Sequence, residues 1–411
     1  MPVTTTDAPA RRHQGVGAAP QPLLWRGLAA ATLAVLLAAC AGPPALRQSV
    51  LNYDETTSTL DQELMLLNIA RISQGGNPHF TVTGSIAATF DFSTNTGLGG
   101  TITQGGGGNL LNLSLGSSAS ENPTFQIIPV TGQDFTRRLV SPLPEEALST
   151  LVFQGDNFEQ VARLLASGIE VQQRNGHFDR FILNDPSVPD EYMRFRRIVM
   201  HLAWLQQRRE LFVSTLRFDR TLLAGLKNAP SVEDLFRAGG LSARRKADGS
   251  YDLVEATLGR LLISNYDPRA LSNEEALALN DVAQGNPKNF AMVDIRADRP
   301  GGAMPLFGAF KLRSLIEVLG AVGRGIEAAP EHDVARDPRT GGGGVSPRST
   351  LAILRSDAAP ADDAPVVRYR GRFYSVADTP WDRAGFFMLN LLFQFSVSDV
   401  SNIGIPITIS K

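Results

Sequence analysis

The stretch FTVTGSIAATFDF, residues 80–92, alternates apolar side chains with small or hydroxyl-bearing ones without a break. A repeat of two is typical of a β-strand whose two faces differ. At about 3.3 Å per residue, such a strand reaches roughly 40 Å. A Gly-rich segment, TGLGGTITQGGGGN (96–109), follows it, and the alternation resumes at residues 111–115. These features predict a long, Gly-rich β-hairpin over residues 79–130.

The hairpin carries almost no charge, because residues 72–136 contain no Lys or Arg and only three acids. One interpretation is a sheet covered on one face by helices, with its glycine loop exposed. The other is that both strands enter a membrane as part of an oligomeric channel, since spanning strands need about 9–11 alternating residues with aromatics near the interfaces. The side chains that would contact lipid or a partner are Phe80, Val82, Ile86, Phe90, Phe92, Leu111, Leu113 and Leu115.

Elsewhere the chain mixes apolar repeats of three and four with short alternating runs, so we expect helices and strands in one α+β fold, with mostly antiparallel strands. The expected helices cover residues 46–73, 144–154, 189–209, 272–284 and 311–326 and a segment that begins at Pro380. The expected strands cover residues 211–218, 289–297 and 402–410, and hairpins are expected at 242–255 and 366–376.

Local signals support several of these boundaries. Asp248-Gly249 is a common turn in a tight hairpin. Ser272 with Glu275, and Asp156 with Glu159, have the spacing of a capping box, in which each residue satisfies a free N–H at the start of a helix. We therefore expect helices to begin directly after residues 156 and 272.

Composition divides the chain into segments. Residues 328–365 are rich in Pro, Gly, Ala and Asp, which is typical of a mobile loop. The expected segments are a leader (1–39), a tether and N-terminal helix (40–78), the hairpin region (79–130), an α+β core (131–327), a flexible loop (328–365), and a C-terminal hairpin, helix and strand that complete the core (366–411).

The sequence offers little catalytic or metal-binding chemistry. No two of His79, His177, His201 and His332 lie within five residues of each other, so no local zinc motif exists. His201, in an apolar helical segment, is expected to be structural, and His79 stands at the start of a strand. The Gly-rich segment lacks the lysine of a phosphate-binding loop. We expect no catalytic residue, no metal and no cofactor.

The predicted helix at 189–209 contains five arginines, including Arg196. These arginines fit a solvated helix face, and the alternative is contact with lipid headgroups. An enzyme that uses scattered Asp and Glu residues is a further alternative for the whole chain.

The only cysteine lies in LLAACAG, residues 36–42. Thirteen uncharged residues, 27–39, precede it, and Arg11, Arg12 and Arg26 lie before or at the edge of that run. A basic leader followed by an apolar run too short to cross a bilayer is the layout of a secretory signal.

The run Leu37-Ala38-Ala39-Cys40 resembles the lipobox of bacterial lipoproteins. The resemblance implies that Cys40 receives a diacylglyceryl group and becomes the first residue after cleavage. Ala41 stands where an Asp tends to retain Gram-negative lipoproteins at the inner membrane, so the resemblance points to the outer membrane. Residues 122–144, the segment 366–376 and the C-terminal isoleucine strand look like uncharacterised Gram-negative envelope lipoproteins of similar length, a group that implies no activity.

Charge also limits the partners. Without residues 1–39 the chain has 40 acids and 36 bases, which gives no electrostatic case for nucleic acid. We therefore expect a lipoprotein of the outer membrane, facing the periplasm or the cell surface, that acts as a structural or scaffolding component of an envelope complex. Its expected partners are the membrane, through the lipid on Cys40, and envelope proteins. The alternatives are a homo-oligomeric outer-membrane channel that inserts the 79–130 hairpin, and a periplasmic enzyme.

Overall fold

The computed structural model describes residues 23–101, 110–237, 239–342, 345–360, 365–396 and 407–410. The chain forms two compact units, Met1–Ser58 and Thr59–Lys411. In chain order the elements are α1 (Leu23–Ser73), β1 (Thr81–Thr101), β2 (Leu110–Pro129), α2 (Gln133–Val140), α3 (Glu145–Phe153), α4 (Phe158–Leu165), β3 (Ala166–Gln172), β4 (Phe178–Leu183), α5 (Pro189–Gln207), β5 (Phe212–Leu226), α6 (Val232–Arg237), β6 (Leu241–Arg245), β7 (Tyr251–Ser264), the 3-10 turn η1 (Pro268–Ala270), α7 (Asn273–Gln284), β8 (Phe290–Ile295), β9 (Leu306–Leu312), α8 (Leu315–Ile326), β10 (Ile353–Ser356), β11 (Val366–Tyr369), β12 (Arg372–Val376), α9 (Pro380–Ser396) and β13 (Ile407–Ser410).

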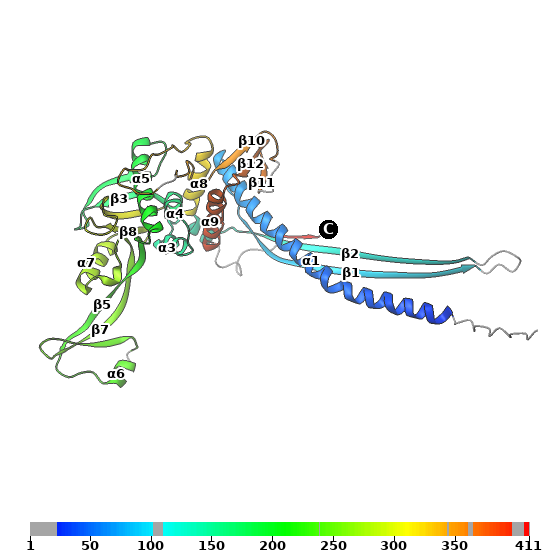
Figure 1. The fold of residues 1–411 in the computed structure, drawn as a ribbon, viewed down its shortest axis with the longest axis horizontal. Helices are drawn as coiled ribbons and strands as arrows, with labels where there is room; N and C mark the ends of the chain where they lie inside the picture. Colours follow the sequence, from blue (N-terminus) through cyan, green and yellow to red (C-terminus); the bar gives the residue numbers. More distant parts are fainter. Residues whose placement is uncertain are drawn as a thin grey trace, which may run out of the picture. The chain divides into compact units, whose positions relative to one another are not determined.

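A seven-stranded sheet forms the centre of the second unit (Figure 1). Its strands lie in the order β4-β3-β9-β8-β7-β5, and β6 pairs with the outer part of β7. Its pairs are antiparallel except β7 with β8, which is parallel. A smaller antiparallel sheet has the order β10-β12-β11. The α+β fold with mixed helices and mostly antiparallel strands is thus confirmed.

The two faces of the central sheet bury separate apolar clusters. Leu261 and Ile263 of β7 belong to the main core, which also contains residues of α3, α4, α5, α8 and α9. Leu262 between them packs on the other face, with Leu279 and Ala283 of α7. Because side chains alternate along a strand, a strand that is apolar at successive positions is covered on both faces.

Phe310 of β9 joins α4 and α5 to the sheet. Its ring meets Phe158 of α4 edge-on at 5.8 Å and Phe195 of α5 edge-on at 6.4 Å, and all three side chains are fully buried. This aromatic contact fixes the two helices against each other above one face of the sheet. The ionic groups described below lie at the contact between these helices.

Most predicted boundaries are confirmed within one or two residues, including those of α3, α5 and α7. Ser272 and Glu275 form the predicted capping box, and Gly249 has a positive φ of 86° at the predicted hairpin turn. Other predictions are wrong. The strand predicted over residues 211–218 continues to Leu226 as β5. Asn157, not Asp156, caps α4 by accepting the N–H of Glu159. The segment 311–326 is also not one helix, because its first two residues finish β9.

The N-terminal helix is longer than predicted. We expected a tether after Cys40 and a helix over 46–73, but α1 is helical from Leu23 to Ser73, through the Pro43-Pro44 pair. Gly42 and the two prolines are unfavourable in a helix interior, so the local sequence signal predicts a break at the point where α1 continues.

The structure gives the hairpin as two long strands. β1 and β2 pair in antiparallel register from Thr81 opposite Pro129 to Thr101 opposite Leu110, with one irregularity between Thr83 and Ile86. β13 pairs with β2, and residues 402–406 of the predicted C-terminal strand lie outside the described residues. Residues 102–109, within the predicted glycine loop, also lie outside them.

The base of the hairpin is fixed by Phe80, which is 4% exposed. Its ring stacks on Phe393 of α9 at 5.3 Å and meets Phe135 of α2 edge-on at 5.6 Å. The Phe80 carbonyl accepts the N–H of Val130 at 2.9 Å, which closes the base. Phe80 is therefore a core residue, and its predicted place among aromatics at a membrane interface is corrected.

We predict that Phe80→Ala lowers the free energy of unfolding by about 3–5 kcal/mol, because it removes a buried aromatic ring and leaves a cavity. Urea denaturation followed by circular dichroism measures the change. Phe387→Ala is the matched control, since Phe387 lies on α9 but is 58% exposed. Equal effects of the two substitutions would contradict the assignment of Phe80 to the core.

Candidate functional site

Two fully buried arginines lie where α4 and α5 pack together. The side chains of Arg163 on α4 and Arg196 on α5 are 0% exposed. Glu159, one helical turn before Arg163, accepts hydrogen bonds from them at 3.2 and 3.4 Å. Glu331, which follows α8, lies 2.8 Å from Arg163 and 3.8 Å from Arg196. We call these two arginines and two glutamates the ionic cluster.

Helical spacing brings these groups together. Glu159 and Arg163 are four residues apart on α4, and Tyr192 and Arg196 are four apart on α5, so each pair lies on one helix face. The Tyr192 hydroxyl donates a hydrogen bond to the Glu331 carboxylate and accepts one from Arg196 at 2.9 Å. The packing of the helices then places the two faces against each other.

The ionic cluster binds the backbone of residues 346–350. Arg163 donates to the carbonyl oxygens of Pro347 at 2.9 Å and Arg348 at 2.7 Å. Arg196 donates to the same two carbonyls at 3.1 and 3.1 Å. An irregular segment with few apolar residues is thus held through its carbonyl groups.

Two predictions are corrected by this arrangement. Arg196 does not lie on a solvated helix face or in contact with lipid, because its charge is buried between two carboxylates. The segment 328–365 is not uniformly a mobile loop either: the N–H and hydroxyl of Thr350 donate to Glu331 at 2.6 and 2.9 Å, and residues 353–356 form β10. Residues 361–364 of the segment lie outside the described residues.

The cluster fixes its own charge states. Burial alone would raise the pKa of Glu331, but the charge of Arg163 and the hydrogen bonds from Thr350 and Tyr192 lower it below its usual value. Burial alone would lower the pKa of Arg163, but the charges of Glu331 and Glu159 and the hydrogen bond to Glu331 raise it. Burial and then the charge of Glu331 raise the pKa of Tyr192. At neutral pH Glu331 is therefore ionised and Tyr192 is neutral.

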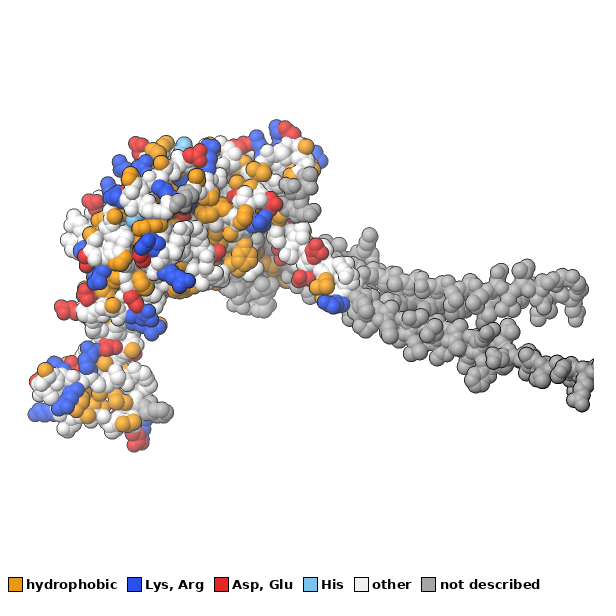
Figure 2. All heavy atoms as spheres, viewed as in Figure 1, with side chains coloured by type: hydrophobic (Ala, Val, Ile, Leu, Met, Phe, Trp, Pro, Cys, Tyr) orange, Lys and Arg blue, Asp and Glu red, His pale blue; other side chains and the backbone are white. Residues whose placement is uncertain are grey.

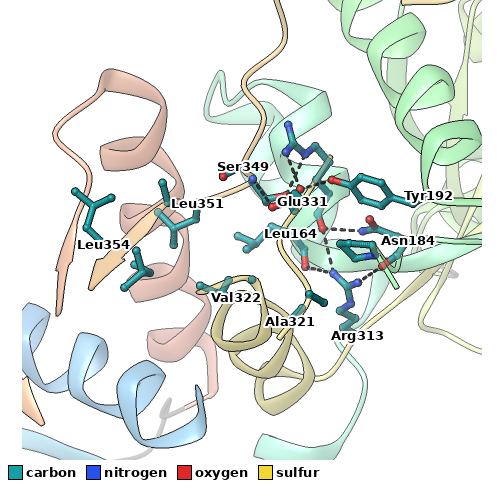
Figure 3. A pocket seen from close by; sticks show the side chains of 17 residues that line it. Leu164, Asn184, Tyr192, Arg313, Ala321, Val322, Glu331, Ser349, Leu351 and Leu354 are labelled. Atoms are coloured by element: carbon teal, nitrogen blue, oxygen red, sulfur yellow. Dashed lines mark hydrogen bonds and ion pairs between the residues drawn. The ribbon is translucent and has the colours of Figure 1, made fainter. Parts of the chain in front are cut away.

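A cavity of about 200 Å³ lies beside the cluster. Figure 3 shows Asn184, Tyr192 and Arg313 on one side of it and Leu351 and Leu354 on the other. The polar side comes from α5, the residue after β4 and the junction of β9 with α8, and the apolar side comes from β10 and the residues just before it. The cavity therefore has one polar and one apolar end.

Arg313 is the cation of the polar end that lies outside the ionic cluster. It is 7% exposed and donates to the carbonyls of Arg163 and Leu164 at 3.1 Å each and of Asn184 at 2.8 Å. In the part of the chain that the structure describes, no carboxylate lies within ion-pair distance of it. Burial, and next the charge of Arg324, lower its pKa to about 10.

These groups are suited to binding. Glu331 is ionised and already accepts bonds from Arg163, Tyr192 and Thr350. A general acid or base needs a pKa near the working pH and a free position for its proton. Glu331 has neither a pKa near neutral pH nor a free position for a proton. Arg313 and the apolar side of the cavity can instead hold an anionic molecule.

The structure leaves most of the predicted hairpin residues untested. Phe80 is buried in the core and Val82 packs against it. The remaining predicted side chains, which are Ile86, Phe90, Phe92, Leu111, Leu113, Leu115 and Cys40, lie outside the described side chains.

The histidines do not gather at the cavity. His201 is buried, with Nδ1 3.0 Å from the Thr340 hydroxyl and Nε2 2.8 Å from the Gly301 carbonyl, so both ring nitrogens have partners. Burial lowers its pKa. His79 is exposed. Among the described residues, no three His, Cys, Asp or Glu side chains are placed to hold a metal ion.

Sequence reasoning missed the ionic cluster and the cavity. The signal was present in FEQVARLL, residues 158–165, where Glu159 and Arg163 occur one turn apart in a helix whose residues are all buried. Two opposite charges at this spacing in an otherwise apolar segment indicate a buried ion pair. The distant partners, Glu331 and the carbonyls of residues 347 and 348, left no local signal.

A second feature is an arm, which we define as residues 219–258, containing the outer parts of β5 and β7 with α6 and β6 (Figure 1). Of its described side chains only Val254 is buried. Figure 2 shows hydrophobic side chains among charged ones on this part of the surface. The exposed apolar residues are Leu222 at 46%, Leu223 at 56%, Val232 at 84% and Leu258 at 66%.

Within the described part of the chain, no helix has the length and the apolar character needed to cross a bilayer. Comparison with known proteins found no matching family model, no similar curated protein and no similar solved structure.

We predict that Glu331→Gln lowers the free energy of unfolding at pH 7 by about 3–5 kcal/mol, because it removes one partner of a buried ion pair. The lowered pKa means that Glu331 stabilises the fold above the unfolded value, about 4.5, and that this contribution is lost as the pH falls through the folded value. Urea unfolding at pH 7 and pH 3 should therefore show a smaller difference between variant and wild type at pH 3.

Glu233→Gln is the matched control, since the ion pair of Glu233 with Arg237 is 74% and 72% exposed. Exposed pairs contribute little. A loss of stability at Glu331 no larger than at Glu233 would show that the ionic cluster does not hold the fold.

Proposed function

We propose that the protein is a bacterial lipoprotein, held at the outer membrane by acyl chains on Cys40, that acts as a structural or scaffolding component of an envelope complex. The lipobox-like residues 37–40 support the anchor. A single acyl chain binds membranes only marginally, whereas two or three hold firmly, so this anchor needs no further membrane contact from the fold. The body would face the periplasm or the cell surface.

The arm is the observation that carries the assembly role. The arm is a three-stranded sheet in which β5 and β6 both pair with β7. Even a three-stranded sheet needs a packed hydrophobic face to be stable in water, and this arm has one buried side chain among those described and four exposed large apolar ones. Covering those side chains with another protein would remove apolar area from water and order the arm. We propose that an envelope protein covers the arm.

Binding without catalysis fits the same structure. The two glutamates of the ionic cluster are committed to arginines, a tyrosine, hydroxyls and a backbone N–H group. Their charges hold α4, α5 and residues 346–350 together.

The paired strands β1 and β2 favour a second candidate, a subunit of an oligomeric outer-membrane channel. They contain 21 and 20 residues, about twice the 9–11 that a spanning strand needs. In this candidate, copies of the chain assemble through the 79–130 hairpin, and the arm has no role in holding them together.

The anchor predicts a specific outcome in the native cell envelope. Wild-type protein should partition with the outer-membrane fraction, and mass spectrometry should show an N-terminal Cys40 with added acyl chains. Cys40→Ser should abolish acylation and release the protein from that fraction. An unmodified Cys40 thiol in wild-type protein from the native host would contradict the proposed anchor.

The arm predicts a crosslink. A photo-reactive amino acid at position 223 of the full-length protein, in intact cells, should give a discrete adduct with another envelope protein, because Leu223 would lie in the interface. The same group at position 153 is the control, since Phe153 is 67% exposed on α3. Adducts only between copies of the chain would show that the arm joins copies of this protein and would contradict the proposed envelope partner. Equal yields of crosslinked adducts at positions 223 and 153 would contradict the proposal that a partner covers the arm.

A further inference from the structure

The charge of Arg313 is only partly compensated inside the protein. Its guanidinium has five N–H groups, and its three hydrogen bonds all go to backbone carbonyls. Those of Arg163 and Leu164 belong to the last turn of α4, where a helix dipole supplies roughly half a negative charge. A positive charge therefore remains at the polar end of the cavity, together with donor capacity for a further acceptor.

Arg163, by contrast, is committed. It donates to Glu159, Glu331, the Thr350 hydroxyl and two backbone carbonyls. An anion entering the cavity would therefore meet Arg313 as the available cation, and it would also meet ionised Glu331 on the same wall.

The opposite end of the cavity suits a short apolar chain. Val322, Leu351, Ile353 and Leu354 line it. An apolar cavity of about 150 Å³ in another protein holds benzene, so a cavity of about 200 Å³ has room for roughly eight non-hydrogen atoms. A carboxylate with five further carbon atoms has this size.

We propose that the cavity binds a monocarboxylate with a short apolar chain, whose carboxylate pairs with Arg313 and whose chain lies against Val322 and Leu351. A carboxylate matches the planar fork of a guanidinium. Such a group occurs in a small free acid and at the C-terminus of a peptide that ends in an apolar residue.

Isothermal titration calorimetry of the full-length protein at pH 7, in detergent, tests this site with hexanoate as the probe. We expect hexanoate to bind at least tenfold more tightly than hexanol, because hexanol lacks the charge, and more tightly than inorganic phosphate, which lacks the apolar chain. Equal affinity for hexanoate and hexanol, or no binding of hexanoate, overturns the proposal.

Two variants locate the site. Arg313→Gln should weaken hexanoate binding at least tenfold. Because Arg313 also holds the end of α4, Ala321→Phe serves as a second variant, which keeps the charge of Arg313, fills the cavity from α8 and should also abolish binding. Ala256→Phe, at an exposed position on β7, is its control and should leave the affinity unchanged. Binding that survives Ala321→Phe overturns the assignment to this cavity.

A peptide that ends in leucine distinguishes the two sources of the carboxylate. Competition with hexanoate by the peptide with a free C-terminus, and not by its amidated form, would assign the site to a protein C-terminus. Competition by neither form would assign it to a free acid.

Discussion

The buried ion pair between Arg163 and Glu331 determines where residues 331–351 lie. This segment has few apolar side chains, so it cannot be held by hydrophobic burial alone. A buried carbonyl must be hydrogen-bonded or its burial costs free energy. Arg163 supplies several donors at one point and Glu331 keeps its charge compensated, so the pair lets an irregular segment pack against α4 and α5. The 2.8 Å contact therefore connects the chain after α8 to the helices before it.

Burying Arg163 and Glu331 has a desolvation cost, and the fold offsets it by giving hydrogen-bond partners to every nitrogen of the guanidinium and both oxygens of the carboxylate. A buried pair can cost as much as its attraction returns, unless further hydrogen bonds satisfy the remaining donors and acceptors. Both oxygens of Glu331 accept bonds, and Arg163 donates from all three of its nitrogens. Arg313 is the contrast: it is as deeply placed, yet its partners are carbonyl oxygens and no carboxylate among the described residues. The arginine at position 163 thus has its charge compensated and holds the fold together. The arginine at position 313 keeps a residual positive charge.

The sequence predicted elements well and distant contacts poorly, and the reason is the range of the signal. The capping box at Ser272, the turn at Gly249 and the apolar repeats of α5 depend on neighbours within a few residues. A lone charge on a helix is usually exposed, so the sequence predicts a solvated face for Arg196. Its partners Glu159, 37 residues earlier, and Glu331, 135 residues later, show otherwise. The segment 328–365 had the composition of a mobile loop because the carbonyls that hold part of it are common to every residue. Phe80 looked like an interface aromatic because its contacts, Phe135 and Phe393, lie far along the chain.

The arm and the proposed lipid anchor bear on each other physically. A protein held to a membrane by acyl chains has its membrane contact supplied by those chains, so apolar residues exposed on the folded body need another explanation. Single exposed leucines are ordinary on protein surfaces. Four large apolar side chains on an arm with little core of its own are different, because the strands that carry them gain little stability from their own packing. Such an arm opens at low free-energy cost when alone.

A partner that covers the arm must supply the free energy that orders it, which lowers the affinity below what the contact area implies. Confinement of both proteins to one membrane surface raises their effective concentration, which offsets that loss. The proposed lipid on Cys40 would then do more than localise the protein to the membrane. It would also make a weak contact between the arm and its partner sufficient for assembly.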